Sequence, residues 1–176
     1  MITRKEMTRM LLKEGLLSWL ANNSFESVTV TSLCKASGIT RSTFYLHYSN
    51  IMEIVDDLVD DAIAYSKPGM VDNNNLQTIA NTLSAASNSV SLREAYDSIF
   101  DRLPLCQRII RHKKYLPLFL DEQISEYVLQ RIIGREKDRQ GLVIAESLGV
   151  SFDVGVSVFV FLVHGLYAVN KQYKWS

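Results

Sequence analysis

The chain has 176 residues, of which 47% are hydrophobic and 22% charged, and its formal net charge at pH 7 is zero. This composition is that of an ordinary globular protein and excludes a chain that is disordered throughout. Because it has three prolines, eight glycines and few alternating β-branched runs, we predict an all-α fold.

Reactive residue types are sparse. Cys34 and Cys106 are too few and too far apart for a disulfide framework or a zinc cluster, and the three histidines are isolated. No phosphate-cradling glycine loop or activated-nucleophile signature occurs. We therefore expect no catalytic activity, no metal and no other cofactor. Buried reduced thiols and a start without a signal-peptide pattern predict a cytoplasmic protein.

Charge is unevenly distributed along the chain. Residues 1–50 hold six lysines and arginines against three glutamates, which leaves +3, whereas residues 51–72 hold six acidic side chains and one lysine. Such a dipole orients the N-terminal part toward phosphate. The acidic run taken alone is equally consistent with solvated helix faces.

The N-terminal elements carry clear capping signals. Thr3 with Glu6 forms a capping box that opens a helix running to about Ala21. Thr29 caps a short second helix, and Gly38 supplies a positive-φ break after it. Thr40 can cap a third helix, whose buried side is Phe44 and Tyr48.

The outward side of this third helix carries Arg41, Ser42, Thr43, Tyr45, Leu46 and His47. Arginine can fork onto guanine and hydroxyls can serve several base edges, so such a helix suits the DNA major groove. Helix, glycine turn and helix also occur in many small domains that do not bind DNA.

Further detail favours DNA binding. The first third of the chain resembles the N-terminal DNA-binding domain of the TetR family of bacterial transcriptional regulators. The residues that carry the resemblance, in the family's order and spacing, are Leu12, Leu16, Leu20, Phe25, Glu26, Thr29, Val30, Leu33, Ala36, Gly38, Ile39, Thr40, Thr43, Phe44, Tyr45, His47, Tyr48, Ser49, Asn50 and Glu53.

The resemblance implies a division of the chain. Residues 1–49 form a three-helix helix-turn-helix head, residues 50–66 a connecting helix, and residues 67–176 a helical effector-binding and dimerisation body. The DNA-binding residues that it implies are Thr29, Thr31, Arg41, Ser42, Thr43, Tyr45, Leu46 and His47. This chain departs from the family at Ile51, where members often carry a lysine that contacts phosphate, and at Thr31, where some carry a longer side chain.

For the rest of the chain, the spacing of apolar residues and the positions of helix breakers predict the helices. Apolar residues recur at helical spacing from Ile51 to about Tyr65, and residues 66–75 form a breaker. We predict helices over 76–89, 92–103 and 117–133, the last beginning at Pro117. Gly141 and Gly149 bracket a short piece, 142–148.

The last segment is apolar nearly all round from Val154 to Val169. A membrane span usually needs about 20 apolar residues, and this run is shorter and interrupted by Ser157 and His164. A buried strand is conceivable, but the length and the closing lysines favour a helix. A helix without a polar face must be covered on all sides, which predicts a homodimer.

The family resemblance implies a four-helix dimer interface and an effector pocket in the body. Its expected interface residues are Leu118, Tyr127, Val128, Ile132, Val158, Phe161, Leu162, Gly165 and Val169. An aromatic set with a few polar tips is the candidate pocket lining, although each member is also a plausible core residue: Tyr96, Phe100, Tyr115, Phe119, Tyr127, Phe159, His164 and Tyr167.

We therefore expect a dimeric repressor that binds a palindromic operator in double-stranded DNA and is released by a small-molecule effector. The alternative is a TetR-like activator or adaptor whose body binds a partner protein. We expect no membrane association in either case.

Overall fold

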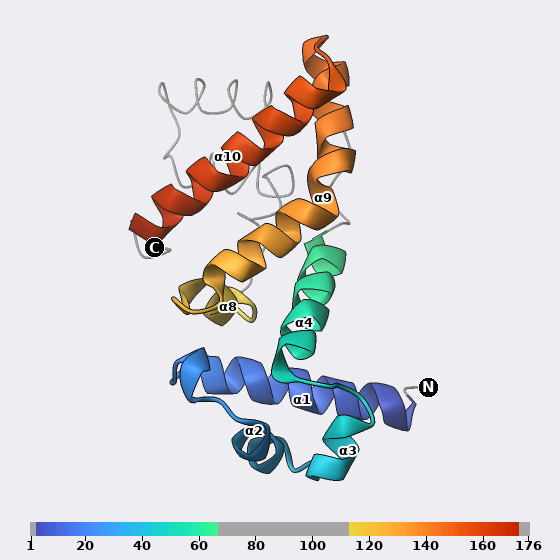
Figure 1. Ribbon diagram of the computed structural model, residues 1–176, viewed down its shortest axis with the longest axis vertical. Coiled ribbons are helices and arrows are strands. Elements are labelled where there is room, and N and C mark those ends of the chain that lie inside the picture. The colour runs from blue at the N-terminus through green and yellow to red at the C-terminus, as the bar shows by residue number, and fades with distance from the viewer. Residues whose placement is uncertain (1–2, 67–112, 173–176) are drawn as a thin grey trace, which may run out of the picture. The chain divides into compact units, whose positions relative to one another are not determined.

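A computed structural model of the protein describes residues 3–66 and 113–172 (Figure 1). These residues form seven α-helices and no strand, which confirms the all-α prediction for this part of the chain. The breaker at 67–75, the predicted helices over 76–89 and 92–103, and the pocket candidates Tyr96 and Phe100 lie outside the described residues.

Helix α1 spans Arg4–Leu20 and begins with the predicted capping box. Thr3 accepts a hydrogen bond from the backbone N–H of Glu6, whose carboxylate accepts one from the Thr3 N–H at 2.7 Å. Leu12, Leu16 and Leu20 are buried at four-residue spacing, so one face of α1 lies in the core.

Helix α4 spans Ile51–Ser66 and confirms the predicted fourth helix. The backbone N–H of Glu53 donates to the Asn50 side chain at 3.1 Å, while its carboxylate accepts from the Ser49 N–H at 2.8 Å. This reciprocal pairing satisfies N–H groups at the helix start. The buried face of α4 consists of Ile54, Val55, Leu58, Val59, Ala62 and Ile63.

The single helix predicted over 117–133 is wrong, because the chain breaks at Asp121. Helix α8 covers only Leu116–Leu120, and helix α9 spans Ser125–Leu148. The Asp121 side chain accepts from the N–H groups of Gln123 at 2.9 Å and Ile124 at 3.2 Å. A side chain that satisfies nearby N–H groups in this way competes with helix continuation.

The short piece predicted over 142–148 is also wrong at its first boundary, since α9 continues through Gly141 and ends before Gly149. Helix α10 spans Phe152–Gln172, so the last segment is a helix, as predicted. A Cβ on Gly155 would overlap the carbonyl oxygen of Gly141 and lie 2.9 Å from the Ala145 nitrogen. Gly141 is therefore a close-approach residue that lets α9 and α10 touch along their backbones.

The described helices belong to two compact units. The first contains α1, the 3-10 helix η1 (Phe25–Ser27), α2 (Val30–Ser37), α3 (Arg41–Tyr45), α4 as far as Ala62, α8 and α9 as far as Ile132. Of the described residues, the second contains the end of α4 from Ile63, α9 from Ile133 onward and α10. Residues 113–132 thus pack with the N-terminal helices, although they are far from them in sequence.

Helix α10 is, within residues 3–66 and 113–172, the one helix long and apolar enough to cross a membrane. The core helices of water-soluble proteins can have the same length and composition. Its buried residues, Gly155, Phe159, Val163 and Tyr167, recur every four positions and form a single stripe. Phe161 lies outside that stripe and is 75% exposed, so residues 3–66 and 113–172 cover only part of α10.

Gly155→Ala should lower the free energy of unfolding by about 1–3 kcal/mol, because the added methyl group forces two packed backbones apart. The matched control is Gly134→Ala in α9, where a Cβ meets nothing within 4 Å. That change should raise stability by about 0.5–1 kcal/mol through helix propensity alone. Urea unfolding followed by circular dichroism measures both, and equal effects would contradict the close crossing.

Candidate nucleic-acid interface

Two short helices joined by a glycine turn make up the candidate interface. Thr29 caps α2 by accepting from the Ser32 N–H at 3.0 Å, and the Ser32 hydroxyl accepts from the Thr29 N–H at 2.9 Å. Gly38 has φ 67° and ψ 26°, a left-handed conformation that ends the helix, as the sequence predicted. The N–H of Ile39 then donates to the carbonyl of Cys34 at 2.9 Å.

The start of α3 is held by hydroxyl groups. Thr40 caps the helix through the N–H of Thr43 at 3.2 Å. The Thr40 hydroxyl also lies 3.0 Å from the Ser42 hydroxyl and 2.8 Å from the Thr43 hydroxyl. The hydroxyl groups of Ser42 and Thr43 are therefore fixed at the first turn of α3. Their remaining hydrogen-bonding capacity is available to a ligand.

Helix α3 ends at Tyr45, so Tyr48, predicted on its buried side, lies just beyond it. The predicted inner and outer sides of this stretch are confirmed for its aromatic residues. Phe44 and Tyr48 are buried, at 0% and 3% exposure, whereas Tyr45 is 53% exposed. The ring of Tyr45 packs edge-on against Phe44, with centroids 5.2 Å apart. One ring thus fixes α3 to the core and the other remains at the surface.

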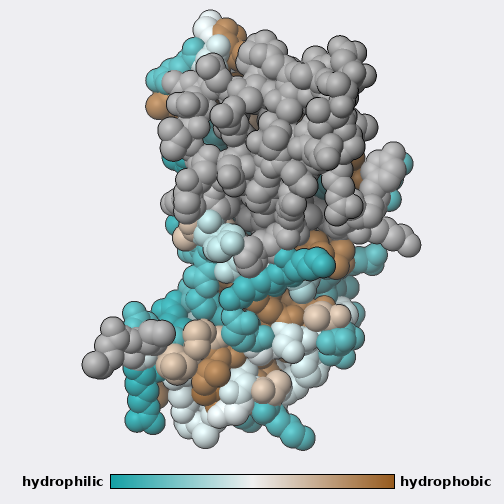
Figure 2. Space-filling view, turned by 180° about the vertical axis from the view of Figure 1, so that it is seen from behind, coloured by the Kyte–Doolittle hydropathy of each residue, from teal (hydrophilic) through white to brown (hydrophobic). Residues whose placement is uncertain are grey.

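The structure places the remaining predicted DNA-binding residues at or near the surface. Thr29, Thr31, Arg41 and Ser42 are exposed, Leu46 is 80% exposed, and Thr43 and His47 are half-buried. In the lower part of Figure 2, hydrophilic, intermediate and hydrophobic residues lie side by side on the surface. The surface therefore offers a guanidinium, hydroxyls and apolar groups together, the set that reads base edges and thymine methyls.

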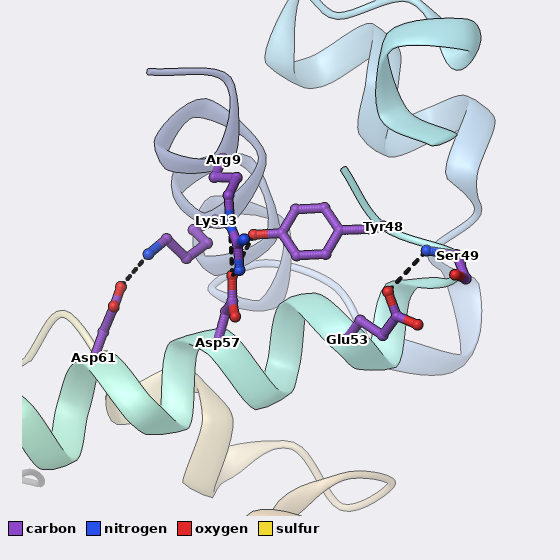
Figure 3. Close-up of polar contacts among 7 residues, drawn as sticks. All are labelled: Arg9, Lys13, Tyr48, Ser49, Glu53, Asp57 and Asp61. Atoms are coloured by element: carbon purple, nitrogen blue, oxygen red, sulfur yellow. Dashed lines mark hydrogen bonds and ion pairs between the residues drawn. The ribbon is translucent and has the colours of Figure 1, made fainter. Parts of the chain in front are cut away.

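A polar cluster behind α3 was missed by sequence reasoning. Tyr48 donates its hydroxyl to Asp57 of α4 at 2.6 Å, and Arg9 of α1 donates its Nε to the same carboxylate at 3.0 Å (Figure 3). The Arg9 guanidinium also lies 5.1 Å from the centroid of the Tyr48 ring. We call Arg9, Tyr48 and Asp57 the Asp57 cluster; it joins α1, α4 and the end of α3.

A second ion pair, between Lys13 and Asp61, links α1 to α4 one turn further along (Figure 3). Asp57 and Asp61 both belong to the acidic run of residues 51–72. From the sequence, this run could either form one end of a charge dipole or simply be a solvated helix face. The structure shows that these two carboxylates are partners of α1. The one available signal was the four-residue spacing shared by Arg9 and Lys13 and by Asp57 and Asp61.

Burial and hydrogen bonding shift the pKa values of the Asp57 cluster. Burial of the Tyr48 phenol raises its pKa well above the usual value, and its hydrogen bond to Asp57 raises it further. Burial also acts to raise the pKa of the Asp57 carboxyl, but hydrogen bonds from Tyr48 and Arg9 outweigh it and lower that pKa. At neutral pH the cluster therefore holds a carboxylate and a neutral phenol.

Residues 113–132 hold the N-terminal helices through polar contacts. Asp121, which is 9% exposed, accepts from the backbone N–H of Phe25 at 2.7 Å. Tyr127 donates its hydroxyl to Asp56 at 2.6 Å, and the Arg131 Nε lies 3.0 Å from the same carboxylate oxygen. Asp121 thus connects the turn between α8 and α9 to η1, which leads into α2.

The described pocket candidates fall into both units. Tyr115, Phe119 and Tyr127 belong to the first, where the first two are buried. Phe159 and Tyr167 are buried in the second, and His164 is half-buried there. In the part of the chain described, no group of three or more His, Cys, Asp or Glu side chains could hold a metal ion.

The expected dimer residues divide by exposure. Leu118, Val128 and Ile132 are buried within this chain, at 0–2% exposure. Tyr127, Phe161, Gly165 and Val169 are exposed, and Val158 and Leu162 are half-buried. Among the expected dimer residues, those of α10 therefore form an apolar stripe that is at least partly exposed.

Comparisons with models of protein families, with curated proteins and with solved structures find no match to this chain.

Asp57→Asn should lower the free energy of unfolding at pH 7 by about 1–2 kcal/mol, because Arg9 and Tyr48 lose a charged acceptor. The pKa of Asp57 in the folded protein lies below the ordinary value of 3.8. The stability that the ionised carboxylate adds is therefore fully present above pH 3.8 and is lost as the pH falls through the lower, folded-state pKa. Urea titrations from pH 7 to pH 3 should therefore show that the difference in free energy of unfolding between the wild type and Asp57→Asn narrows below about pH 4. A gap that stays constant to pH 3 would contradict the assignment.

Proposed function

We propose that this protein is a dimeric transcriptional regulator of the TetR type, in which α2 and α3 form a helix-turn-helix and α3 enters the major groove. The observation that carries the proposal is the first turn of α3. There a short helix after a left-handed glycine exposes Arg41 and Ser42, while Phe44 anchors its other side in the core.

The chemistry of this surface supports DNA as the ligand. Arg41 can form two hydrogen bonds with guanine, and Ser42 and Thr43 can bond to base edges or phosphates. The side chains of Tyr45 and His47 are better suited to contacts with phosphate than with bases. Thr29 would anchor the start of α2 to the DNA backbone. The charge of +3 over residues 1–50 adds a sequence-independent attraction that salt will weaken.

A second copy of the chain would supply the other half of a palindromic site. Val154, Val158, Phe161, Gly165 and Val169 recur at spacings of three or four along α10. All are exposed except Val158, which is half-buried, and they lie on a different side from the stripe of Phe159 and Val163. An apolar stripe of this period packs well on its own copy. The two recognition helices of such a dimer would read half-sites about 34–36 Å apart or at a wider spacing.

Regulation would follow from a change in the spacing of the two recognition helices. In the proposed repressor, a small-molecule effector prefers a spacing that does not fit the operator and thereby releases DNA. The exposed Phe161 also supports a second candidate, in which this face of α10 docks a partner protein and the chain acts as an activator or adaptor.

Selection of bound duplexes from a random library, followed by anisotropy titration at two salt concentrations, tests the proposed function. We expect an enriched palindrome that binds two subunits more tightly than a scrambled duplex does at both salt concentrations. Recovery of no preferred sequence, with equal salt-sensitive binding to every duplex, would contradict a sequence-specific regulator.

Arg41→Ala should weaken binding to the enriched duplex by about 1–3 kcal/mol and broaden the base preference at one position in each half-site. Lys137→Ala, which removes the same charge from an exposed position of α9, controls for the general loss of positive charge. Equal loss on enriched and random duplexes would show that Arg41 contacts phosphate instead.

Phe161→Glu should convert the dimer into a monomer in sedimentation equilibrium, because a carboxylate buried in an apolar seam is left without a partner. Leu142→Glu makes a similar change at a 51% exposed position of α9 and should leave the dimer intact. A dimer that survives Phe161→Glu would move the interface away from this stripe.

A further inference from the structure

Three parts of the first unit meet at a single carboxylate oxygen. Oδ2 of Asp57 accepts hydrogen bonds from the Nε and Nη2 of Arg9 and from the hydroxyl of Tyr48. Arg9 belongs to α1, Asp57 to α4, and Tyr48 to the turn that leaves α3 (Figure 3). The oxygen is shared by donors from two directions, so moving either donor changes the bonding of the other.

Tyr48 is a direct extension of α3. Its backbone N–H donates to the carbonyl of Phe44 at 3.0 Å, and the N–H of His47 donates to the same carbonyl at 2.9 Å. The ring is buried, and its centroid lies 6.1 Å from that of Phe44. Any rotation of α3 about its axis therefore moves the Tyr48 hydroxyl relative to Asp57.

Packing by itself specifies this rotation weakly. Helix α3 has five residues and one fully buried side chain, Phe44, and apolar contact is not directional. A hydrogen bond to a carboxylate is directional and short, here 2.6 Å. It therefore fixes an angle that the Phe44 ring leaves free.

We propose that Asp57 is a positioning residue that sets the orientation of α3 on the rest of the head, acting through the hydroxyl of Tyr48 and oriented by Arg9. The effect on DNA recognition rests on the proposed function, whereas the effect on α3 itself does not. Base-edge contacts depend on the angle of α3, while contacts with phosphate tolerate a change in angle.

The chain offers a closely matched set of variants. Tyr48→Phe removes only the hydroxyl and keeps the buried ring. Asp57→Asn removes the shared acceptor charge. Asp61→Asn is the control, because Asp61 also lies on α4 and also pairs with a cation of α1, Lys13, but it has no hydrogen bond to Tyr48 among the described contacts.

The first readout is backbone hydrogen exchange of the full-length protein without DNA. In Tyr48→Phe and Asp57→Asn, the N–H groups of Phe44, His47 and Tyr48 should exchange about tenfold faster relative to those in the middle of α1, as expected from one lost charged hydrogen bond. In Asp61→Asn this ratio should change less than about twofold. A general loss of stability accelerates α1 as well and leaves the ratio unchanged, and that result would overturn the proposal.

The second readout is the ratio of affinities for a duplex enriched by the wild-type protein and for a random duplex. Tyr48→Phe should lower this ratio about tenfold, with random-duplex affinity within about twofold of wild type, and Asp61→Asn should preserve both. An unchanged ratio in Tyr48→Phe would overturn the positioning of α3 for base recognition.

The two readouts separate failure of the proposed function from failure of this inference. If the wild-type protein enriches no duplex, the proposed function is wrong, and the exchange ratio still decides whether Asp57 positions α3. If a duplex is enriched but neither ratio moves in Tyr48→Phe, the regulator stands and the positioning role is wrong.

Discussion

The hydrogen bonds at Asp57 are the interaction on which the arrangement of α1, α3 and α4 depends. Helix α3 is too short to hold itself, because a five-residue helix leaves nearly all of its backbone groups at its ends. Its orientation must come from its neighbours: α2 packs against it, and α4 and α1 contact Tyr48, three residues after its end, with directional interactions. Burial of Phe44 holds α3 against the core. The hydrogen bond from Tyr48 to the carboxylate of Asp57 fixes the rotation of α3 about its own axis.

The charge pattern takes on a different meaning once partners are known. Asp56, Asp57 and Asp61 lie on α4, and each is paired with donors from other elements of the first unit. These three residues of the acidic run therefore form hydrogen bonds and ion pairs with α1, α9 and Tyr48, instead of facing only solvent. Arg9 and Lys13, which count toward the basic charge of the head, are in turn committed to α4. Fewer cations are therefore left for the proposed contact with DNA than the composition implies.

Two glycines show how a single residue type serves opposite purposes. Gly38 ends α2 because a side chain there would strain a left-handed backbone. Gly141 does not end α9; it brings the backbone of α10 close enough to touch. The first role is visible in the sequence, because a capped helix start follows two residues later. The second depends on Gly155, which lies in another helix.

The sequence by itself determined the helical class, the helix starts at Thr3, Thr29 and Thr40, the left-handed turn at Gly38 and the buried side of α3. These features depend on signals within about four residues, where caps and periodicity act. The break at Asp121 has a local cause, the bonds to Gln123 and Ile124, which the predicted helix over 117–133 overlooked. Only the tertiary structure decided the contact of Asp121 with Phe25, the continuity of α9 through Gly141 and the Asp57 cluster. Asp121 bonds to Phe25 across 96 positions and Asp57 to Arg9 across 48. A partner at that distance is not identified by the local sequence, even where a matching four-residue spacing exists, because the pairing is set by how helices pack and not by what lies beside either residue in the chain.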